Sequence, residues 1–199
     1  MTPIAFLPGA AGRPGFWRPV ADRLSDLGHV HLVGYPGFAG LPPDPALGSL
    51  DDLYRWVVAR LPAEPFDVVA QSMGGVLAAR LALDAPSRVR RLVLAATSGG
   101  LDVASLGAAD WRPGYRASLP DVPPWFLVDR TDLSARLPSL RTPTLLLWSD
   151  ADPVSPLAVG ETLRRVLPDA RLEVIRGGDH GFGESRADEV AALVRAFLG

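Results

Sequence analysis

A single serine, Ser72, lies where the chain could supply a nucleophile for hydrolysis. A short apolar run at residues 66–70 comes just before it, and a pattern typical of a helix follows it directly. A tight turn between a buried strand and a helix exposes a serine hydroxyl for attack on a carbonyl carbon. Ala70 and Gly74 are small enough to flank a serine in such a strained turn. The other interpretation is that Ser72 only caps the helix that follows it.

A histidine that could take the proton of this serine occurs near the end of the chain. His180 lies in the glycine-rich stretch 177–181, beyond another apolar run, where it has no apolar surface to complete. An imidazole in that setting is suited to acid–base chemistry near neutral pH. A catalytic histidine also needs a carboxylate that fixes its tautomer, and Asp150 and Asp152 both follow a further apolar run.

Taken together, these segments resemble the serine α/β-hydrolase family. The resemblance rests on A-Q-S-M-G-G at 70–75, on the stretch 145–156 and on G-G-D-H-G at 177–181, in the order nucleophile, acid, histidine. It covers nearly the whole chain. Each motif is common alone, and the set of three is specific.

The resemblance implies a role for each of these side chains. Ser72 would be the nucleophile and His180 the general base. The acid of the family follows the pattern G-x-x-D, and Ser149 takes the place of the glycine here, so Asp152 is the match. Asp150 is the competing candidate, and it is better suited to stabilising the turn by accepting hydrogen bonds from the backbone.

The resemblance also implies an oxyanion hole, formed by the backbone N–H groups of Ala10 and Met73. Ala10 lies in the loop at 8–15, after the first apolar run, and Met73 follows Ser72. Family members usually carry histidine where this chain has Pro8, so the usual side-chain brace of the loop is missing. The alternative for this loop is a plain connector rich in glycine and proline.

Apolar runs alternate with amphipathic patterns along the chain, which predicts strands alternating with helices. This alternation predicts an α/β fold with about six mostly parallel strands, and the resemblance implies the three-layer hydrolase arrangement with helices on both faces. The proposed catalytic residues all fall at the carboxyl ends of strands, where such sheets bind ligands. The predicted strands are 4–7, 29–33, 66–70, 89–96, 144–148 and 171–175, and the predicted helices include 16–27, 49–60, 157–167 and 187–198.

Residues 99–140 have a different character, with many prolines and aromatic residues and little periodicity. We interpret the chain as one domain over 1–199 with a short cap inserted at about 99–140, the alternative being a surface excursion. A short cap would enclose little, which favours small to medium acyl groups or compact aromatic ones. The residues expected to form the substrate pocket are Phe16, Tyr35, Phe38, Trp111, Tyr115, Trp125, Phe126 and Phe182.

The amino-acid composition limits the classes of partner that we expect for this protein. The chain has 199 residues, a net charge of −2 and no concentrated basic segment, so we expect a small-molecule substrate and neither nucleic acid nor membrane. The chain lacks cysteine, and the spacing of His29 and His31 comes without a third ligand, so no metal site is expected. The first residues resemble no secretion signal, and we expect a cytoplasmic protein.

The expected function is hydrolysis of a small-molecule ester or thioester through Ser72, His180 and Asp152, with an acyl-enzyme intermediate and no cofactor. Two alternatives use the same three residues: a cofactor-free lyase or synthase, and a hydrolase of carbon–carbon bonds. A third alternative is a ligand-binding protein on a hydrolase scaffold. The sequence leaves the oligomeric state open.

Overall fold

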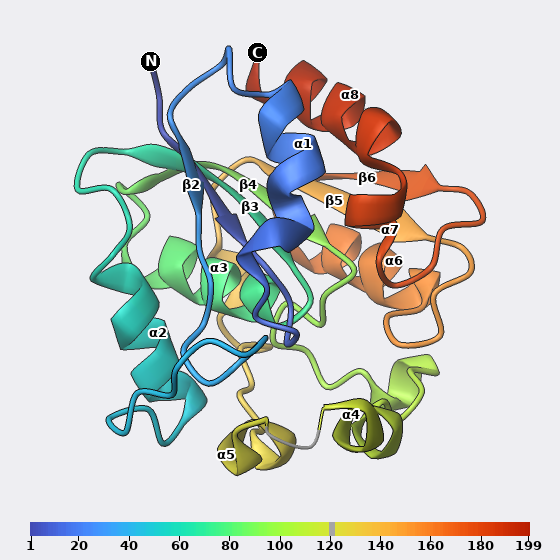
Figure 1. Cartoon of the computed structure of the whole chain (residues 1–199). Helices are drawn as coiled ribbons and strands as arrows, with labels where there is room; N and C mark the ends of the chain where they lie inside the picture. Colours follow the sequence, from blue (N-terminus) through green and yellow to red (C-terminus); the bar gives the residue numbers. More distant parts are fainter. Residues whose placement is uncertain (120–121) are drawn as a thin grey trace.

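The structure is a computed structural model of the chain, and it describes residues 1–119 and 122–199. Within these residues, six strands form one sheet in the order β2-β1-β3-β4-β5-β6, and every pair of neighbours is parallel. The predicted parallel α/β fold is therefore confirmed (Figure 1). The strands are β1 Ile4–Leu7, β2 Val30–Leu32, β3 Phe66–Gln71, β4 Val89–Ala95, β5 Thr144–Ser149 and β6 Ala170–Ile175.

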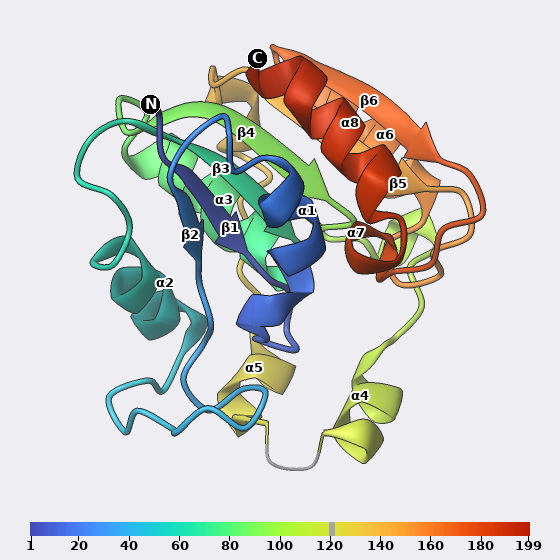
Figure 2. The same ribbon diagram turned by 45° about the horizontal axis from the view of Figure 1, so that its top comes forward.

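Helices cover both faces of this sheet, and each face has its own apolar core. Phe16, Val20 and Leu24 pack with Val190 and Val194 against one face, which α1 and α8 cover. The other face packs against α2, α3 and α6 (Figures 1 and 2). In the described part of the chain, no helix has the length and apolar character needed to cross a membrane. The main helices are α1 Arg18–Arg23, α2 Leu50–Val58, α3 Met73–Asp84, α6 Leu157–Val166, α7 Phe182–Ser185 and α8 Ala187–Leu198.

The first predicted helix, 16–27, is wrong in extent. A 3-10 turn, η1 Pro14–Trp17, comes first, and α1 occupies only Arg18–Arg23. The amide of Leu24 bonds to the carbonyl of Ala21 instead of continuing the α-helical pattern, and the Ser25 hydroxyl donates to Asp22 O. These local bonds close the helix early.

The described residues of the inserted segment form four short helical pieces. They are η2 Ala104–Leu106, α4 Arg112–Ser118, α5 Pro124–Val128 and η3 Leu137–Ser139. Proline occupies an early position of α4, α5 and η3, where its missing N–H costs no hydrogen bond. In both views, α4 and α5 lie beyond the carboxyl ends of the strands, over the edge where the predicted catalytic residues fall (Figures 1 and 2).

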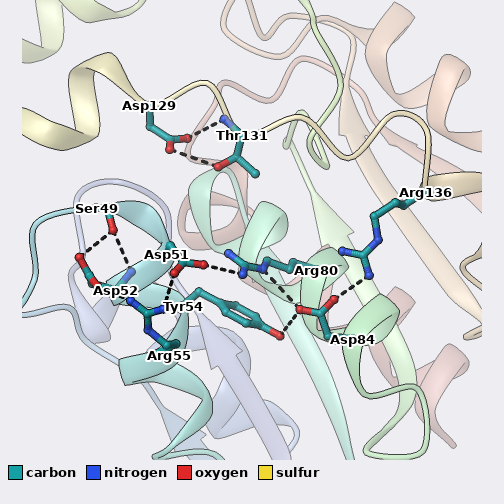
Figure 3. Close-up of polar contacts among 10 residues, drawn as sticks. All are labelled: Ser49, Asp51, Asp52, Tyr54, Arg55, Arg80, Asp84, Asp129, Thr131 and Arg136. Carbon is teal, nitrogen blue, oxygen red and sulfur yellow. Dashed lines mark hydrogen bonds and ion pairs between the residues drawn. The ribbon is translucent and has the colours of Figure 1, made fainter.

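A polar network ties the end of this insertion to the helices beneath it. Asp84 of α3 accepts hydrogen bonds from the Tyr54 hydroxyl of α2 at 2.8 Å and from Arg136 at 2.6 Å. Arg80 bonds to Asp51 of α2 at 2.6 Å, and its guanidinium lies 4.0 Å from the centre of the Tyr54 ring. Figure 3 shows how these side chains from α2, α3 and the returning chain point toward one another. The network fixes where the chain re-enters the body after α5.

Candidate functional site

Three loops at the carboxyl edge of the sheet bring a serine, a histidine and an aspartate into contact. The Oγ atom of Ser72 lies 3.2 Å from Nε2 of His180, and Nδ1 of His180 lies 2.7 Å from Oδ2 of Asp152. Ser72 follows β3, Asp152 follows β5 and His180 follows β6. The three predicted catalytic side chains thus form one hydrogen-bonded chain, although they are far apart in the sequence.

Ser72 has a strained backbone, with φ 53° and ψ −121°. A non-glycine residue in such a conformation costs about 1–3 kcal/mol and persists only where its surroundings fix it. Here the amide of Ser72 donates to Ala95 O at 3.0 Å, and the Thr97 hydroxyl donates to Ser72 O at 2.6 Å. Among the described residues, the Ser72 side chain makes no capping hydrogen bond to α3, so its hydroxyl is left to face His180.

The start of α3 is packed so tightly that two of its positions require glycine. A Cβ atom on Gly74 would lie 2.4 Å from Pro8 O and 2.7 Å from Leu7 O, and one on Gly75 would lie 2.5 Å from Thr97 Oγ1. Real Cβ atoms essentially never approach other atoms this closely. The glycines therefore let the helix begin directly against the ends of β1 and β4, and this fixes the position of Ser72.

We expect Gly74→Ala to lower the free energy of unfolding by about 1–3 kcal/mol, because the new methyl group meets backbone oxygens that cannot rotate away. Urea unfolding would measure the loss. Gly114→Ala in α4 is the matched control, since a Cβ there meets no described atom within 4 Å. Equal unfolding midpoints for the two variants would contradict the close packing at Gly74.

Asp152 is placed as a charged partner for the imidazole. Its side chain is almost fully buried, and its Oδ1 accepts hydrogen bonds from Val154 N at 2.8 Å and Ser155 N at 3.2 Å. Burial raises the pKa of Asp152, but the hydrogen bond and charge of His180 and these two amides outweigh burial, so the pKa lies below its ordinary value. An ionised Asp152 can accept a hydrogen bond from the Nδ1–H group of His180, which leaves Nε2 unprotonated and able to accept the proton of Ser72.

Asp150 has a different position. Its Oδ1 accepts a hydrogen bond from the amide of Gly177 at 2.6 Å, while its side chain is exposed. Ser149 is fully buried beside it; its hydroxyl donates to Gly178 O and accepts a hydrogen bond from Ala151 N at 3.0 Å. Both side chains join the loop after β5 to the loop that carries His180.

Sequence reasoning missed three residues that hold this arrangement. Thr97 supports the carbonyl of Ser72, Ser149 supports the loop of His180, and the Gln71 amide donates to His180 O at 3.2 Å. All three are buried polar residues at or just beyond the carboxyl ends of apolar strands. A polar residue at that place in a buried strand is the signal that could have identified them.

The predicted oxyanion-hole residues lie at the same cleft. Ala10 and Met73 line it together with Ser72 and His180. Met73 is the first residue of α3, where backbone N–H groups have no partner within the helix. Two preorganised N–H groups facing a developing oxyanion are the usual means of stabilising a tetrahedral intermediate.

The cleft has a volume of about 1070 Å³ and runs from Ser72 up to α4, α5 and the chain beyond them. Four of the predicted pocket residues line it: Phe16, Trp111, Tyr115 and Phe126. Charged side chains of both signs also border it, including Arg13 and Glu184, which form an ion pair at 2.6 Å. The cleft is therefore larger than the small enclosure expected of a short cap.

The prediction is wrong for the other four pocket residues. In the cleft that the described residues form, the lining does not include Tyr35, Phe38, Trp125 and Phe182. Tyr35 is fully buried and donates its hydroxyl proton to Pro8 O at 2.9 Å. Phe38 contacts Trp125 edge-on, with ring centres 6.0 Å apart, and Phe182 is buried in the core beneath α8. These side chains lie in the apolar cores or pack against them instead.

Comparison with known proteins places this geometry among known folds. A family model described as alpha/beta hydrolase fold matches residues 2–134. A pimeloyl-(acyl-carrier protein) methyl ester esterase from Nitrosomonas europaea is 38% identical over 115 residues, which are 58% of this chain and 43% of that protein. This match spans less than half the length of that relative. A putative carbamate hydrolase from Azorhizobium caulinodans is 25% identical over 245 residues, covering 100% of this chain and 91% of that protein.

A solved structure agrees over the whole chain. A hydrolase from Pseudomonas aeruginosa matches with a TM-score of 0.83 and 22% identity, over 100% of this chain and 90% of that one. A likeness at this level of identity concerns the fold alone.

Proposed function

This chain belongs to the alpha/beta hydrolase fold family, and from that premise we propose that it is a serine hydrolase of small-molecule esters or thioesters. The observation that carries the proposal is the hydrogen-bonded chain from Ser72 Oγ through His180 to Asp152. The matched relatives support it, since one is a methyl ester esterase and another a putative carbamate hydrolase. Both names describe the cleavage of an acyl-type bond.

The reaction would proceed in two steps. Ser72 Oγ attacks the carbonyl carbon while His180 Nε2 takes its proton, and the charge that develops on the carbonyl oxygen faces the N–H groups of Met73 and Ala10. His180 then gives the proton to the departing alkoxide or thiolate, which leaves an acyl group on Ser72. Water, deprotonated by His180, attacks this acyl group and releases the acid and the free serine.

The alternatives make different use of the same side chains. A lyase, a synthase or a carbon–carbon hydrolase would use Ser72 and His180 to move protons. A protein that only binds its ligand has no use for a strained serine at φ 53° that is linked through His180 to a buried, ionised Asp152. The ligand-binding alternative is therefore the least supported.

A panel of chromogenic esters and thioesters of increasing acyl length, together with a methyl ester and an aryl carbamate, would test the proposal. A fluorophosphonate probe would be applied to the same preparation. We expect turnover of at least one acyl class and labelling of one serine. Labelling without turnover of any panel member would favour a lyase or carbon–carbon hydrolase, and absence of both would refute the serine hydrolase proposal.

The cap residues that line the cleft should set acyl preference. Trp111 lines it and stacks on Phe126 with ring centres 5.2 Å apart, so we expect Trp111→Ala to change kcat/KM unequally across the panel. A misfitted group changes discrimination by about 10-fold to 200-fold. Trp125→Ala is the matched control, because it removes the same kind of ring from the same insertion but outside the lining. A ranking changed equally by both variants would contradict this assignment.

A further inference from the structure

The end of β1 and the loop that carries Ala10 are held by side chains that donate to their carbonyl groups. The Trp17 indole N–H donates to Leu7 O at 3.0 Å, and the Tyr35 hydroxyl donates to Pro8 O at 2.9 Å. The Tyr115 hydroxyl donates to Ala10 O. These contacts surround the position where Pro8 provides no side-chain hydrogen bond of its own.

Tyr115 differs from the other two donors because it belongs to α4 of the inserted segment. Trp17 and Tyr35 are fully buried in the body of the protein, whereas Tyr115 reaches Ala10 from above the cleft that it lines. Its ring packs between two other cap residues, Trp111 and Phe126, with ring centres 5.4 Å and 5.7 Å away. Burial raises the pKa of Tyr115, so its hydroxyl keeps the proton that it donates.

We propose that Tyr115 is a positioning residue that couples the cap to the oxyanion loop. The hydroxyl of Tyr115 holds the carbonyl of Ala10. In the proposed function, the backbone N–H of Ala10 is one of the two donors to the oxyanion. This contact fixes the Ala10 carbonyl relative to α4, so the organisation of the hole depends on where α4 lies. The inference rests on the proposed function, and it adds that cap position controls stabilisation of the tetrahedral intermediate and not only access.

The test is Tyr115→Phe, which keeps the ring and its packing and removes only the hydroxyl. Loss of an entire oxyanion donor costs on the order of 10² to 10³ in kcat, so loss of a residue that positions one should cost about tenfold. We expect this loss in kcat, with KM changed little, because the contact matters once charge develops on the substrate oxygen. The affinity for phenylboronic acid, which forms a tetrahedral adduct on serine, should fall by a similar factor.

Tyr54→Phe is the matched control. It removes another tyrosine hydroxyl, the one bonded to Asp84 at 2.8 Å, on a residue outside the cleft lining. The bond of Arg136 to Asp84 at 2.6 Å does not involve this hydroxyl, so the chain after α5 keeps its tie to α3. This variant should keep the kcat and the boronic acid affinity of the original protein. A loss that falls on KM alone, or an equal fall of kcat in both variants, would overturn the role of Tyr115.

A third measurement separates this inference from the proposed function. Hydrogen exchange of the amides in residues 9–13 depends on how firmly the loop is held and requires no activity. We expect faster exchange of this loop in Tyr115→Phe and unchanged exchange in Tyr54→Phe. If the original protein hydrolyses no ester and binds no boronic acid, the serine hydrolase proposal fails; unchanged exchange in Tyr115→Phe overturns the brace itself.

Discussion

Ser72→Ala should lower kcat for the best ester of the panel by on the order of 10⁶, the scale reached when a hydrolase loses its nucleophile. The reason is geometric: Ser72 Oγ is the hydroxyl that His180 Nε2 meets, at 3.2 Å. Fluorophosphonate labelling should disappear in the same variant. Circular dichroism and urea unfolding should show the fold intact, because alanine does not force the strained φ and ψ of residue 72 to change.

Ser98→Ala is the matched control for the nucleophile. Ser98 also borders the cleft, but its hydroxyl oxygen accepts a hydrogen bond from Gly100 N at 3.2 Å, which is a contact within its own loop. This variant should keep labelling and most of its turnover. Labelling that survives in Ser72→Ala, or that disappears in Ser98→Ala, would remove Ser72 from the role of nucleophile.

Asp152→Asn should lower kcat by on the order of 10⁴, the loss described for the triad aspartate of a well-studied serine protease. An asparagine amide facing Nδ1 of His180 can donate a hydrogen bond, which favours the tautomer with the proton on Nε2. That tautomer cannot accept the proton of Ser72. Steady-state kinetics on the same ester would measure the loss, and fluorophosphonate labelling should slow in parallel.

Asp150→Asn provides the comparison within the same turn. The hydrogen bond that Asp150 accepts from Gly177 N can also be accepted by an asparagine oxygen, so this variant should lose little activity. Asp150→Asn removes a negative charge from this turn, as Asp152→Asn does. Comparison of the two variants therefore separates the effect of the lost charge from the effect of the His180 tautomer. A larger loss in Asp150→Asn than in Asp152→Asn would transfer the role of the acid to Asp150.

Much of the fold could be predicted because its signals are local. The apolar runs and helical patterns predicted all six strands and the final helix at Ala187–Leu198, since burial on a sheet face imposes a period on the residues themselves. The first helix was predicted too long because apolar periodicity continues through Leu27, while hydrogen bonds made by Leu24 and Ser25 end the helix earlier. Helix propensity alone does not predict at which residue such local hydrogen bonds end a helix.

The candidate site divides in the same way. The turn at Ser72 was recognisable from small neighbours, because steric limits at a tight turn act on adjacent residues. Their place at the ends of buried strands could have marked Thr97 and Gln71 as candidates, but their partners could not be predicted, because each supports a residue on another loop. Nor could the sequence assign Tyr35 to the Pro8 carbonyl and Tyr115 to the cleft, since both are aromatic residues in loops with similar composition.

Residue patterns predict the order of strands and helices along the chain, the tight turn at Ser72, and the position of His180 and two aspartates beyond strand ends. They leave open which aspartate meets His180, which aromatic residues line the cleft, and which side chains hold the Ala10 loop. Periodicity and steric limits act between neighbours in the chain, so they carry the first kind of information. Contacts between loops depend instead on where the parallel strands bring their ends together, and that arrangement exists only after the sheet has formed.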